Sequence, residues 1–410
     1  MRRKRFTDAR TEVIAPSYMR ILTFSTLYPN AARPGHGIFV ETRLRHLLAS
    51  GKVESKVVAP VPWFPSRNPR FGEYAASART PREESRHGID VVHPRYLAIP
   101  RIGMSLAPFL LAAGAYSTVR DALRSPEEIL DAHYFYPDGV AAAIIGRALK
   151  VPVVITARGT DVNLLPEYAI PRRMILWAAS RAAAVVSVSE ALKDALVRLG
   201  VDGGKISVLR NGVDTRMFHP VDRASRRARL GLSSTVLLMV GNLLALKGHE
   251  VVLRALCDFP DACLLIIGEG REEPNLKKLT GSLGLGERVR FLGAVPQEQL
   301  AEYYGAADAL VLASSREGWP NVLLEAMACG TPVVSTRVGG TPEIVAAPEA
   351  GVLADERSPR GIGDALRRLL RSYPDRGLTR RYAERHSWAA TTAGQLELFE
   401  RIRSARTAGR

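Results

Sequence analysis

Residues 314–325, with the sequence SSREGWPNVLLE, hold two glutamates in a setting that suits ligand binding. A strand is expected to lead into the loop that carries Glu317, and a helix at 322–329 carries Glu325 about one turn from its start. The unpaired backbone N–H groups of a helix start form an anion site, and Pro320 suits that position. A carboxylate only accepts hydrogen bonds, so the two side chains fit sugar hydroxyls better than phosphate. Taken alone, the pattern favours an ordinary helix whose start loop carries a solvated glutamate.

Further turns of the same kind surround this segment. A strand at 333–336 is followed by VGGTPE, a glycine turn in which Thr341 is a good N-cap for a second helix. Another strand ends at Gly241 and Asn242, and Lys247 opens the helix behind it, where an ammonium can neutralise a diphosphate leaving group. Without these neighbours, a solvated lysine would be the better interpretation.

Three places in the first half of the chain are candidates for a second half-site. Gly35 and Gly37 precede a helix and permit close approach of a substrate, although their spacing fails as a dinucleotide fingerprint. His133 ends a strand and is expected to face a cleft as an acid, a base or a hydrogen-bond donor, with a structural histidine as the equal alternative. Arg158 offers a planar donor fork for phosphate or carboxylate, and Asp161 could simply pair with it.

Two parallel sheets are needed to position these residues. Short apolar runs alternate with amphipathic helices, and a chain of 410 residues exceeds the size of one core, about 250–300 residues. The first series of strands is expected at residues 20–25, 55–59, 90–93, 128–132, 153–156, 184–188 and 206–209. The second series is expected at residues 235–240, 262–267, 289–292, 309–312, 333–336 and 351–353. We therefore predict an α/β protein with two Rossmann-like, doubly wound domains whose strand ends face a cleft.

The charge and the cysteines narrow the class of protein. The net charge is +16, and residues 1–210 hold 30 Lys and Arg against 18 Asp and Glu, compared with 27 against 23 in the remainder. Such a basic half can meet nucleic acid, an anionic membrane or a phosphorylated substrate, or it can reflect an arginine-rich composition without a specific partner. Cys257, Cys263 and Cys329 fit no zinc pattern, so we expect reduced core thiols and no metal site.

Residues 102–116 are the most apolar stretch of the chain. The stretch is shorter than the ~20 residues that a membrane-spanning helix needs, and it contains Pro108. We expect a buried helix here, the alternative being a helix that lies at an interface.

Longer stretches of the sequence resemble the family-four retaining glycosyltransferases, of the type that builds bacterial cell-surface polysaccharides. The resemblance runs from Met19 almost to the C-terminus. Its most specific part is EGWPNVLLEAMACGTPVVST, in which Glu317 and Glu325 form a Glu-x7-Glu motif, followed by VGGTPEIV. Other matching pieces are VGNLLALKGH, LRNGVDTRMFHP and HSWAATTAGQLELFERI, the last of which is similar to the family's C-terminal helix.

The resemblance implies the GT-B fold, in which the C-terminal helix crosses back to the first domain. We expect residues 1–18 to be a disordered extension, 19–211 an acceptor-binding domain, 212–385 a nucleotide-sugar-binding domain and 386–410 the returning helix. The implied activity is that of a hexosyltransferase, which moves a sugar with retention, without metal and without cofactor. The donor would be a UDP- or GDP-sugar and the acceptor a glycan or a lipid-linked glycan.

Together, the residues and the resemblance indicate three sets of site residues. The catalytic set is His133, Lys247 and Glu317. The donor-binding set is Arg158, Gly241, Asn242, Gly293, Val295, Gly318, Trp319, Pro320, Asn321, Val322 and Glu325. The acceptor-side set is Gly35, Gly37 and Asp161. By resemblance, Glu325 would bind the donor ribose, Glu317 the donor sugar and Lys247 the diphosphate.

Two positions depart from the family's pattern. Many members have Arg where this chain has Asn242, and His where it has Arg158. A guanidinium cannot act as a base at neutral pH, so Arg158 has no such role here. We hypothesise instead that Arg158 supplies the phosphate contact that is lost at position 242. No Asp or Glu is an evident covalent nucleophile, and the family's account is a front-face reaction in which the leaving phosphate helps to deprotonate the acceptor.

Other classes of function are weaker readings of the same residues. A GT-B-fold nucleotide-sugar epimerase or phosphorylase is the alternative among enzymes, but a phosphorylase needs a lysine for pyridoxal phosphate that we cannot identify. A basic nucleic-acid-binding protein is the alternative outside enzymes, but Lys and Arg are spread out, so no nucleic acid partner is expected. The basic first half raises the hypothesis of an anionic membrane surface as a partner, for a cytoplasmic enzyme peripheral on the inner face of the cytoplasmic membrane.

Overall fold

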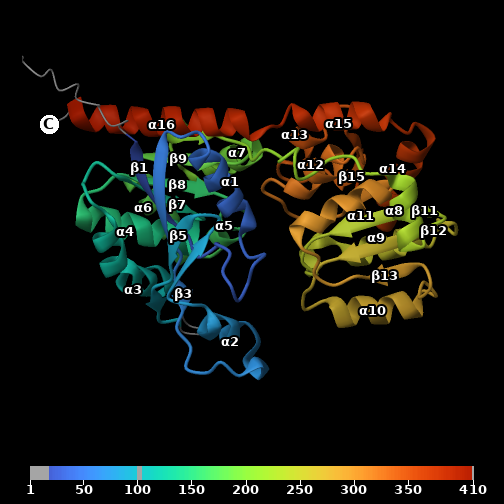
Figure 1. Ribbon diagram of the computed structural model, residues 1–410, viewed down its shortest axis with the longest axis horizontal. Helices are drawn as coiled ribbons and strands as arrows, with labels where there is room; N and C mark the ends of the chain where they lie inside the picture. Colours follow the sequence, from blue (N-terminus) through green and yellow to red (C-terminus); the bar gives the residue numbers. More distant parts are fainter. Residues whose placement is uncertain (1–17, 99–103, 409–410) are drawn as a thin grey trace, which may run out of the picture.

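The computed structural model describes residues 18–98 and 104–408, so the extension expected at residues 1–18 lies almost wholly outside the described residues. Two α/β units lie side by side, and a long helix, α16 (Trp388–Ala408), runs back along the first unit (Figure 1). The predicted fold class is confirmed, because each unit is built around its own largely parallel sheet and the C-terminal helix returns to the first unit.

The first unit contains an eight-stranded sheet. In spatial order its strands are β10 (Ile206–Val208), β9 (Ala184–Ser187), β8 (Val153–Ala157), β7 (Ile129–His133), β1 (Met19–Phe24), β2 (Val53–Val58), β5 (Ile89–Val92) and β4 (Glu83–Arg86). Strand β4 is antiparallel to β5, and the other pairs are parallel. A small ladder beside this sheet joins β3 (Val61–Pro62) to β6 (Arg95–Tyr96).

Alternation along the strands separates the two faces of this sheet. In β1, Ile21 packs toward one apolar cluster, whereas Leu22 and Phe24 pack into another. The first cluster is completed by α1 (Ile38–Leu48) and α16, and the second by α3 (Ala107–Ala122), α4 (Val140–Leu149), α6 (Ala169–Arg181) and α7 (Glu190–Leu199). The remaining helices of the first unit are α2 (Gly72–Arg79) and α5 (Thr160–Asn163).

The second unit repeats this design with six parallel strands. In spatial order they are β13 (Val289–Phe291), β12 (Ala262–Ile267), β11 (Thr235–Val240), β14 (Ala309–Leu312), β15 (Val333–Thr336) and β16 (Gly351–Ala354). One face is covered by α9 (His249–Leu256), α10 (Glu273–Ser282) and α14 (Pro359–Arg371). The other face is covered by α8 (Arg223–Leu230), α11 (Leu300–Ala306), α12 (Asn321–Ala328) and α15 (Arg376–Glu384), and the short α13 (Thr341–Ile344) follows β15.

The C-terminal helix completes the core of the first unit. Leu398 and Phe399 are buried in the same cluster as β1 and α1, and each such side chain stabilises the fold by roughly 1.5–3 kcal/mol. At the start of α16 the Trp388 ring stacks on His46 of α1, with centroids 5.2 Å apart. The chain thus crosses between the units twice, and the two crossings meet in a bridge between Val213 and Ser387.

Three details differ from the sequence expectations. Strand β4 was not predicted, and its hairpin with β5 turns through His87 and Gly88, both at positive φ. The cysteines are reduced, as expected, but Cys257 is exposed and so is not a core thiol. Helix α3 buries only one side, whereas we expected a buried helix, and Phe109 at its start is 51% exposed.

Candidate functional site

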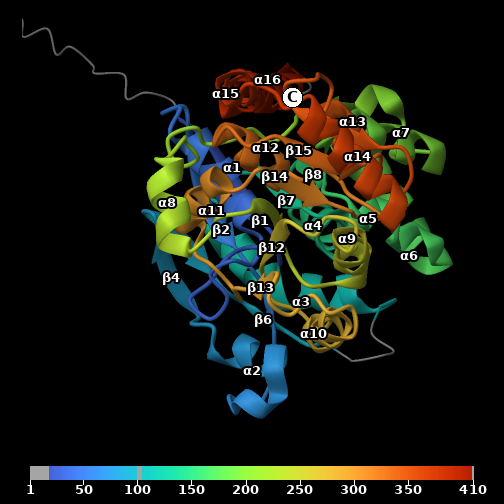
Figure 2. The ribbon, with the colours of Figure 1, turned by 90° about the vertical axis from the view of Figure 1, so that its right-hand side faces the viewer.

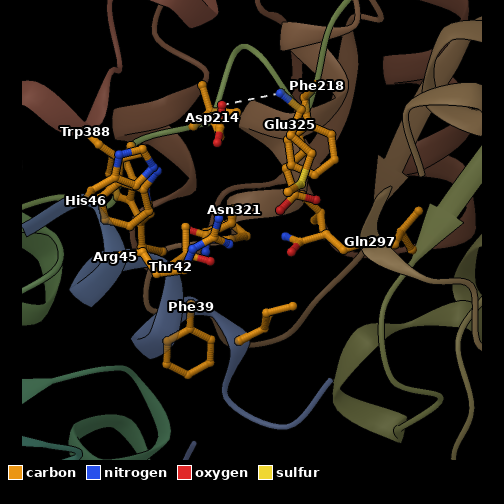
Figure 3. A pocket seen from close by; sticks show the side chains of 18 of the residues that line it. Phe39, Thr42, Arg45, His46, Asp214, Phe218, Gln297, Asn321, Glu325 and Trp388 are labelled. Carbon is orange, nitrogen blue, oxygen red and sulfur yellow. Dashed lines mark hydrogen bonds between the residues drawn. The ribbon is translucent and has the colours of Figure 1, made fainter. Parts of the chain in front are cut away.

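A cleft with a volume of about 680 Å³ opens between the two units. Helix α1 forms one wall, with Phe39, Thr42 and Arg45 among its lining residues, and Gln297 and Glu325 lie on the opposite wall (Figure 3). The predicted site residues that line the cleft are Arg158, Gly241, Asn242, Lys247, Glu317, Gly318, Trp319, Pro320, Asn321, Val322 and Glu325. The predicted residues outside this lining are Gly35, Gly37, His133, Asp161, Gly293 and Val295.

The loop after β14 places Glu317 at the cleft beside a cation. Its Oε1 accepts hydrogen bonds from Nζ of Lys247 and from Oγ of Ser314, both at 2.6 Å. Lys247 comes from the turn before α9, so this pair ties together two strand-to-helix turns of the second unit. Among the described residues Oε2 of Glu317 has no hydrogen-bond donor, which leaves it available to a hydroxyl group in the cleft.

Glu325 lies in α12 and is only 9% exposed, although it borders the cleft. Its Oε2 accepts a hydrogen bond of 2.8 Å from the Tyr304 hydroxyl. Burial raises the pKa of Glu325 to about 7, although hydrogen bonds from Tyr304 and Gln297 oppose the rise. This carboxyl group therefore changes its charge near neutral pH, and hydroxyl donors of a ligand would favour the ionised form.

Gly318 lies where the two units touch. A Cβ atom on Gly318 would lie 2.0 Å from the carbonyl oxygen of Arg158, and one on Gly159 would lie 3.1 Å from the Gly318 nitrogen. Behind the same loop, a Cβ atom on Gly339 would lie 1.9 Å from the backbone carbonyl oxygen of Glu317. Glycine at position 318 therefore allows the first unit to approach the loop, because no side chain would fit there.

Asn211 connects the loop after β14 with the first unit, and no sequence pattern indicated this role. Its backbone oxygen accepts from Nε1 of Trp319 at 2.9 Å, and its Nδ2 donates to Oδ1 of Asn321 at 3.3 Å. Its Oδ1 accepts from Nη1 of Arg158 at 3.3 Å. In sequence, Asn211 followed by Gly212 is indistinguishable from an ordinary linker turn.

His133 does not face the cleft, which corrects the expectation from its place at the end of β7. The side chain is 2% exposed; Nη2 of Arg158 donates to its Nδ1 at 2.7 Å, and its Nε2 lies 3.4 Å from Oδ2 of Asp131. Because Nδ1 accepts a hydrogen bond, the ring proton is on Nε2, toward Asp131. Burial lowers the pKa of His133 to about 4, so the ring is neutral at pH 7. The ring is held inside the sheet by these two partners and supports Arg158 from behind.

Arg158 lies between the buried His133 ring and the cleft. Its guanidinium lies over the Phe39 ring, with Cζ 5.2 Å from the centroid, and its Nε has no partner among the described residues. Burial, together with repulsion from Arg43, lowers the pKa of Arg158 to about 9, which still leaves it cationic at neutral pH. A fixed cation is therefore present in the cleft that also contains Asn242.

Two of the three acceptor-side candidates have structural roles in this conformation, and none of the three lines the cleft. Asp161 is fully buried, and its carboxylate accepts from the backbone N–H groups of Phe135 and Gly159, each at 2.7 Å. Gly37 is in the left-handed region at φ 68° and begins α1, where a Cβ atom would lie 2.2 Å from the Leu27 oxygen. Gly35 is exposed and has open space around it.

The segment after β13 reaches the cleft through a residue that we did not select. Gly293 accepts a backbone hydrogen bond of 2.8 Å from Gly268, and Val295 packs against the core. Gln297, two residues farther on, lines the cleft and donates to Glu325. A lone glutamine in a loop gives no sequence signal for this position.

The comparisons with known proteins cover both units. The family model described as glycosyltransferase family 4 matches residues 99–217, and the model described as glycosyl transferases group 1 matches residues 222–386. The putative teichuronic acid biosynthesis glycosyltransferase TuaC of Bacillus subtilis is 30% identical over 361 residues, which cover 85% of this chain and 89% of that relative. This chain belongs to the family-four glycosyltransferases. D-inositol 3-phosphate glycosyltransferase 1 of Catenulispora acidiphila is also 30% identical, over 86% of this chain and 87% of the relative.

Solved structures support the GT-B fold of this glycosyltransferase. Sucrose-phosphate synthase of Thermosynechococcus elongatus superimposes with a TM-score of 0.77 at 22% identity, over 94% of this chain and all of that one. HepE of Anabaena, solved in complex with UDP-glucose, gives a TM-score of 0.71 at 20% identity, over 95% of this chain and all of that one. The epimerase, phosphorylase and nucleic-acid alternatives are not favoured by these likenesses.

The glycosyltransferase also contains an ionic contact between its units that the sequence did not reveal. Glu343, at the start of α13, accepts from the backbone N–H groups of Glu190 and Ala191 at the start of α7, both at 3.1 Å. The same carboxylate accepts from Nη2 of Arg210 at 2.7 Å. A side chain of the second unit thus satisfies two of the free N–H groups of a helix in the first.

The described residues contain neither a cluster of metal ligands nor a membrane-spanning helix. Among residues 18–98 and 104–408, no group of three His, Cys, Asp or Glu side chains is placed to hold a metal ion. In the same part of the glycosyltransferase, no helix has the length and apolar character that crossing a bilayer requires.

Proposed function

We propose that this glycosyltransferase transfers a hexose from a UDP- or GDP-sugar to a glycan or lipid-linked acceptor in the synthesis of a cell-surface polysaccharide. The observation that carries the proposal is the pair of differently held carboxylates, Glu317 and Glu325, beside Lys247 in one cleft. HepE is described in complex with UDP-glucose, and TuaC is described as a teichuronic acid biosynthesis enzyme. Both descriptions agree with the proposed donor and with the proposed class of product.

Each donor group would meet a suitable partner in the cleft. Glu325, once ionised, accepts from the ribose hydroxyls, and the free Oε2 of Glu317 accepts from a sugar hydroxyl. Lys247 and the free N–H groups at the start of α12 stabilise the diphosphate. These contacts grow stronger as charge develops on the leaving oxygen, which is the condition for catalysis rather than mere binding.

We propose that transfer proceeds with retention. The acceptor oxygen forms a bond to the anomeric carbon on the face from which the diphosphate leaves, the bond from that carbon to the diphosphate oxygen breaks, and the leaving phosphate takes the acceptor proton. Glu317 is a poor nucleophile in this position, because the ion pair with Lys247 and the hydrogen bond from Ser314 draw negative charge from its carboxylate, its free Oε2 included. The anomeric configuration of the product, followed by proton NMR, tests this part: an inverted product would overturn it.

Arg158 is the proposed substitute for the diphosphate contact missing at Asn242. It brings a cation to the shared cleft, and His133 and Asn211 fix its guanidinium. Arg158→Ala should raise the Michaelis constant for the donor on the order of tenfold or more, as expected for a lost charge-assisted hydrogen bond. An unchanged donor constant in this variant would contradict the role.

The proposal includes reaction without a resident metal or cofactor. Its support is that Lys247 and Arg158 offer the positive charge that a diphosphate leaving group requires. Chelation with EDTA should leave nucleotide release unchanged, and loss of activity that Mg²⁺ or Mn²⁺ restores would overturn this part. We also propose a cytoplasmic location, peripheral on the inner face of the membrane, where nucleotide sugars and lipid-linked acceptors meet.

A donor screen tests the central claim directly. The full chain is heated with UDP, GDP and their hexose conjugates, and release of free nucleotide is then measured with a glycan acceptor. Either UDP and its sugars or GDP and its sugars should raise the melting temperature of the chain. Free nucleotide of that same kind should be released from the sugar conjugate only when acceptor is present. Glu317→Gln should keep the thermal shift but lose most of the release. A chain that neither binds nor releases any nucleotide would contradict the function.

A further inference from the structure

Exposed apolar side chains gather at one end of the first unit. Seven of the thirteen large apolar side chains that are exposed in the described residues lie between positions 63 and 109. They are Trp63, Phe71, Tyr74, Leu97, Met104, Leu106 and Phe109. Soluble proteins rarely leave so many large apolar groups together without a binding role.

The strand pair β3–β6 brings these side chains together. Trp63 follows β3 directly and Leu97 follows β6, and the Trp63 backbone N–H donates to the Tyr96 oxygen at 2.7 Å. Helix α3 packs on β6 so closely that a Cβ atom on Gly114 would lie 2.7 Å from Arg95. Figures 1 and 2 show α2 projecting from this end of the unit, away from α16.

The aromatic side chains of this surface are held in place. The partly buried Phe64 ring contacts both exposed neighbours, with its centroid 5.3 Å from Phe71 and 5.2 Å from Tyr74. The guanidinium of Arg70 lies 4.7 Å from the Phe71 centroid. The Phe71 and Tyr74 rings therefore pack on Phe64 in a local cluster at the surface rather than in the core of the unit.

The segment that carries these rings is rich in positive charge. Residues 63–82 contain four arginines and a single acidic residue, Glu73. The arginines are Arg67, Arg70, Arg79 and Arg82. All four are exposed, and none forms an ion pair within residues 18–98 and 104–408. We call Trp63, Phe71 and Tyr74 together with these four arginines the basic aromatic surface.

This surface begins at the sheet edge that faces the cleft. The segment that carries it leaves the sheet at the end of β2, and the β6 segment leaves at the end of β5, while β8 delivers Arg158 at its own end. These strands are parallel, so their carboxyl ends share one edge. A lipid anchored at the basic aromatic surface would therefore present its head group on the acceptor side of the cleft.

We propose that the basic aromatic surface docks this glycosyltransferase on an anionic lipid bilayer. Arginines attract anionic head groups, and Trp and Tyr rings suit the boundary between head groups and acyl chains. Leu97 and Leu106, two further exposed side chains of the same part of the chain, can enter that boundary but offer nothing on which a nucleic acid base would stack. The lipid-linked class of acceptor rests on the proposed function, whereas the docking itself does not.

Flotation of the full chain with vesicles tests the docking. The chain should bind vesicles of phosphatidylcholine mixed with phosphatidylglycerol and fail to bind phosphatidylcholine alone, and added salt should weaken the binding. Replacing the four arginines by glutamine should lower the partition coefficient on the order of a hundredfold. Trp63→Ser, Phe71→Ser and Tyr74→Ser together should lower it on the order of tenfold.

A matched control surface is available on α6. Tyr168 and Ile170 are exposed apolar side chains, and Arg172 and Arg173 beside them are exposed cations. In this control the apolar pair is replaced by serine and the two arginines by glutamine. The change lowers the total charge and apolar content of the chain but leaves the basic aromatic surface intact, so vesicle binding should stay within about twofold of that of the parent chain. An equal loss from this control would mean that overall charge, rather than the basic aromatic surface, binds the lipid, and would overturn the proposal.

Two readouts separate this inference from the proposed function. Donor thermal shift and nucleotide release with a water-soluble glycan should stay unchanged in the variants of the basic aromatic surface, which also shows that they fold. Vesicle binding by the parent chain that ignores anionic lipid, or that persists in both variants, would overturn the docking even if transfer is confirmed. A parent chain that floats with anionic vesicles but uses no nucleotide sugar would overturn the function and leave the docking intact.

Discussion

Glu325 is a carboxyl group of the cleft that binds and releases a proton near neutral pH. Burial raises the pKa of Glu325 to about 7, so near neutral pH this side chain is only partly ionised before a donor arrives. The shift has the sign of a buried acid: its protonated form is favoured in the folded chain, so its contribution to stability is present below pH 4.5 and is lost as pH rises toward 7. A ribose whose hydroxyls donate to Glu325 favours the ionised carboxylate, so its binding displaces the proton that remains on this side chain.

We expect donor binding to release a proton at pH 6 and almost none at pH 8, with affinity about tenfold weaker at pH 6. Isothermal titration calorimetry in buffers of different ionisation enthalpy measures the protons released. Glu325→Gln should abolish the release, whereas Glu317→Gln should keep it. Equal proton release from the parent chain and Glu325→Gln would show that another group titrates.

His133 should act through Arg158 rather than on the substrate. Its Nδ1 accepts the guanidinium at 2.7 Å, a contact that the side-chain oxygen of glutamine can replace and leucine cannot. His133→Leu leaves a buried N–H without a partner, which costs about 1–3 kcal/mol, so kcat/KM should fall roughly 5- to 150-fold. His133→Gln should recover most of the loss with an unchanged pH profile. A proton-transferring histidine would instead lose activity equally in both variants.

At the scale of the elements, the strands were the most predictable feature and the side chains across the cleft the least. Four of the six strands expected in the second unit begin and end as predicted, because short buried apolar runs that alternate with helices are typical of a parallel sheet. Thr341 shows the limit of such rules. It was expected to cap α13, but its hydroxyl donates to the Thr336 oxygen at 2.6 Å and ties the preceding turn instead. Short glycine turns offer a hydroxyl several backbone partners, and tertiary contacts select among them.

Glu343 provides a test of the contact between α13 and α7. Glu343→Gln removes the charge that satisfies two backbone N–H groups and Arg210, so the free energy of unfolding should fall by about 1–2 kcal/mol. Glu384→Gln is the matched control, because Glu384 pairs with Arg380 at 2.7 Å within one helix and should cost only about 0.3–0.5 kcal/mol. Thermal unfolding followed by circular dichroism compares them, and equal losses would contradict a special role for the contact.

For the whole molecule, the relative position of the two units depends on glycine backbones. Gly318 lies against Arg158 with space for no side chain, so Gly318→Ala should hold the units apart and lower kcat/KM at least about tenfold. Small-angle X-ray scattering should show a larger radius of gyration for this variant. Gly35→Ala is the control, because a Cβ atom there meets nothing within 4 Å. Full activity of Gly318→Ala would show that the approach is not needed.

The sequence motifs located the cleft residues of the second unit far better than those of the first unit. Lys247 follows β11, whereas Glu317 and Glu325 follow β14, which lies next to β11 in the same sheet, so the order of the sheet brings these three residues together. The opposite wall is α1, whose Thr42 and Arg45 face the cleft only because of how the two units are placed. Periodicity in one chain predicts which face of a helix is buried, but not which unit will lie across from it.

The returning helix has a consequence for the order in which the chain can fold during synthesis. Leu398 and Phe399 complete an apolar face of the first sheet, yet they leave the ribosome after the whole second unit. At ~5–20 residues per second, that face stays uncovered for roughly 10–40 s after its last strand is made. The core of the first unit is therefore incomplete when its last strand has been synthesised. Chaperones that bind apolar surface can act on it in the interval between the synthesis of β10 and that of α16.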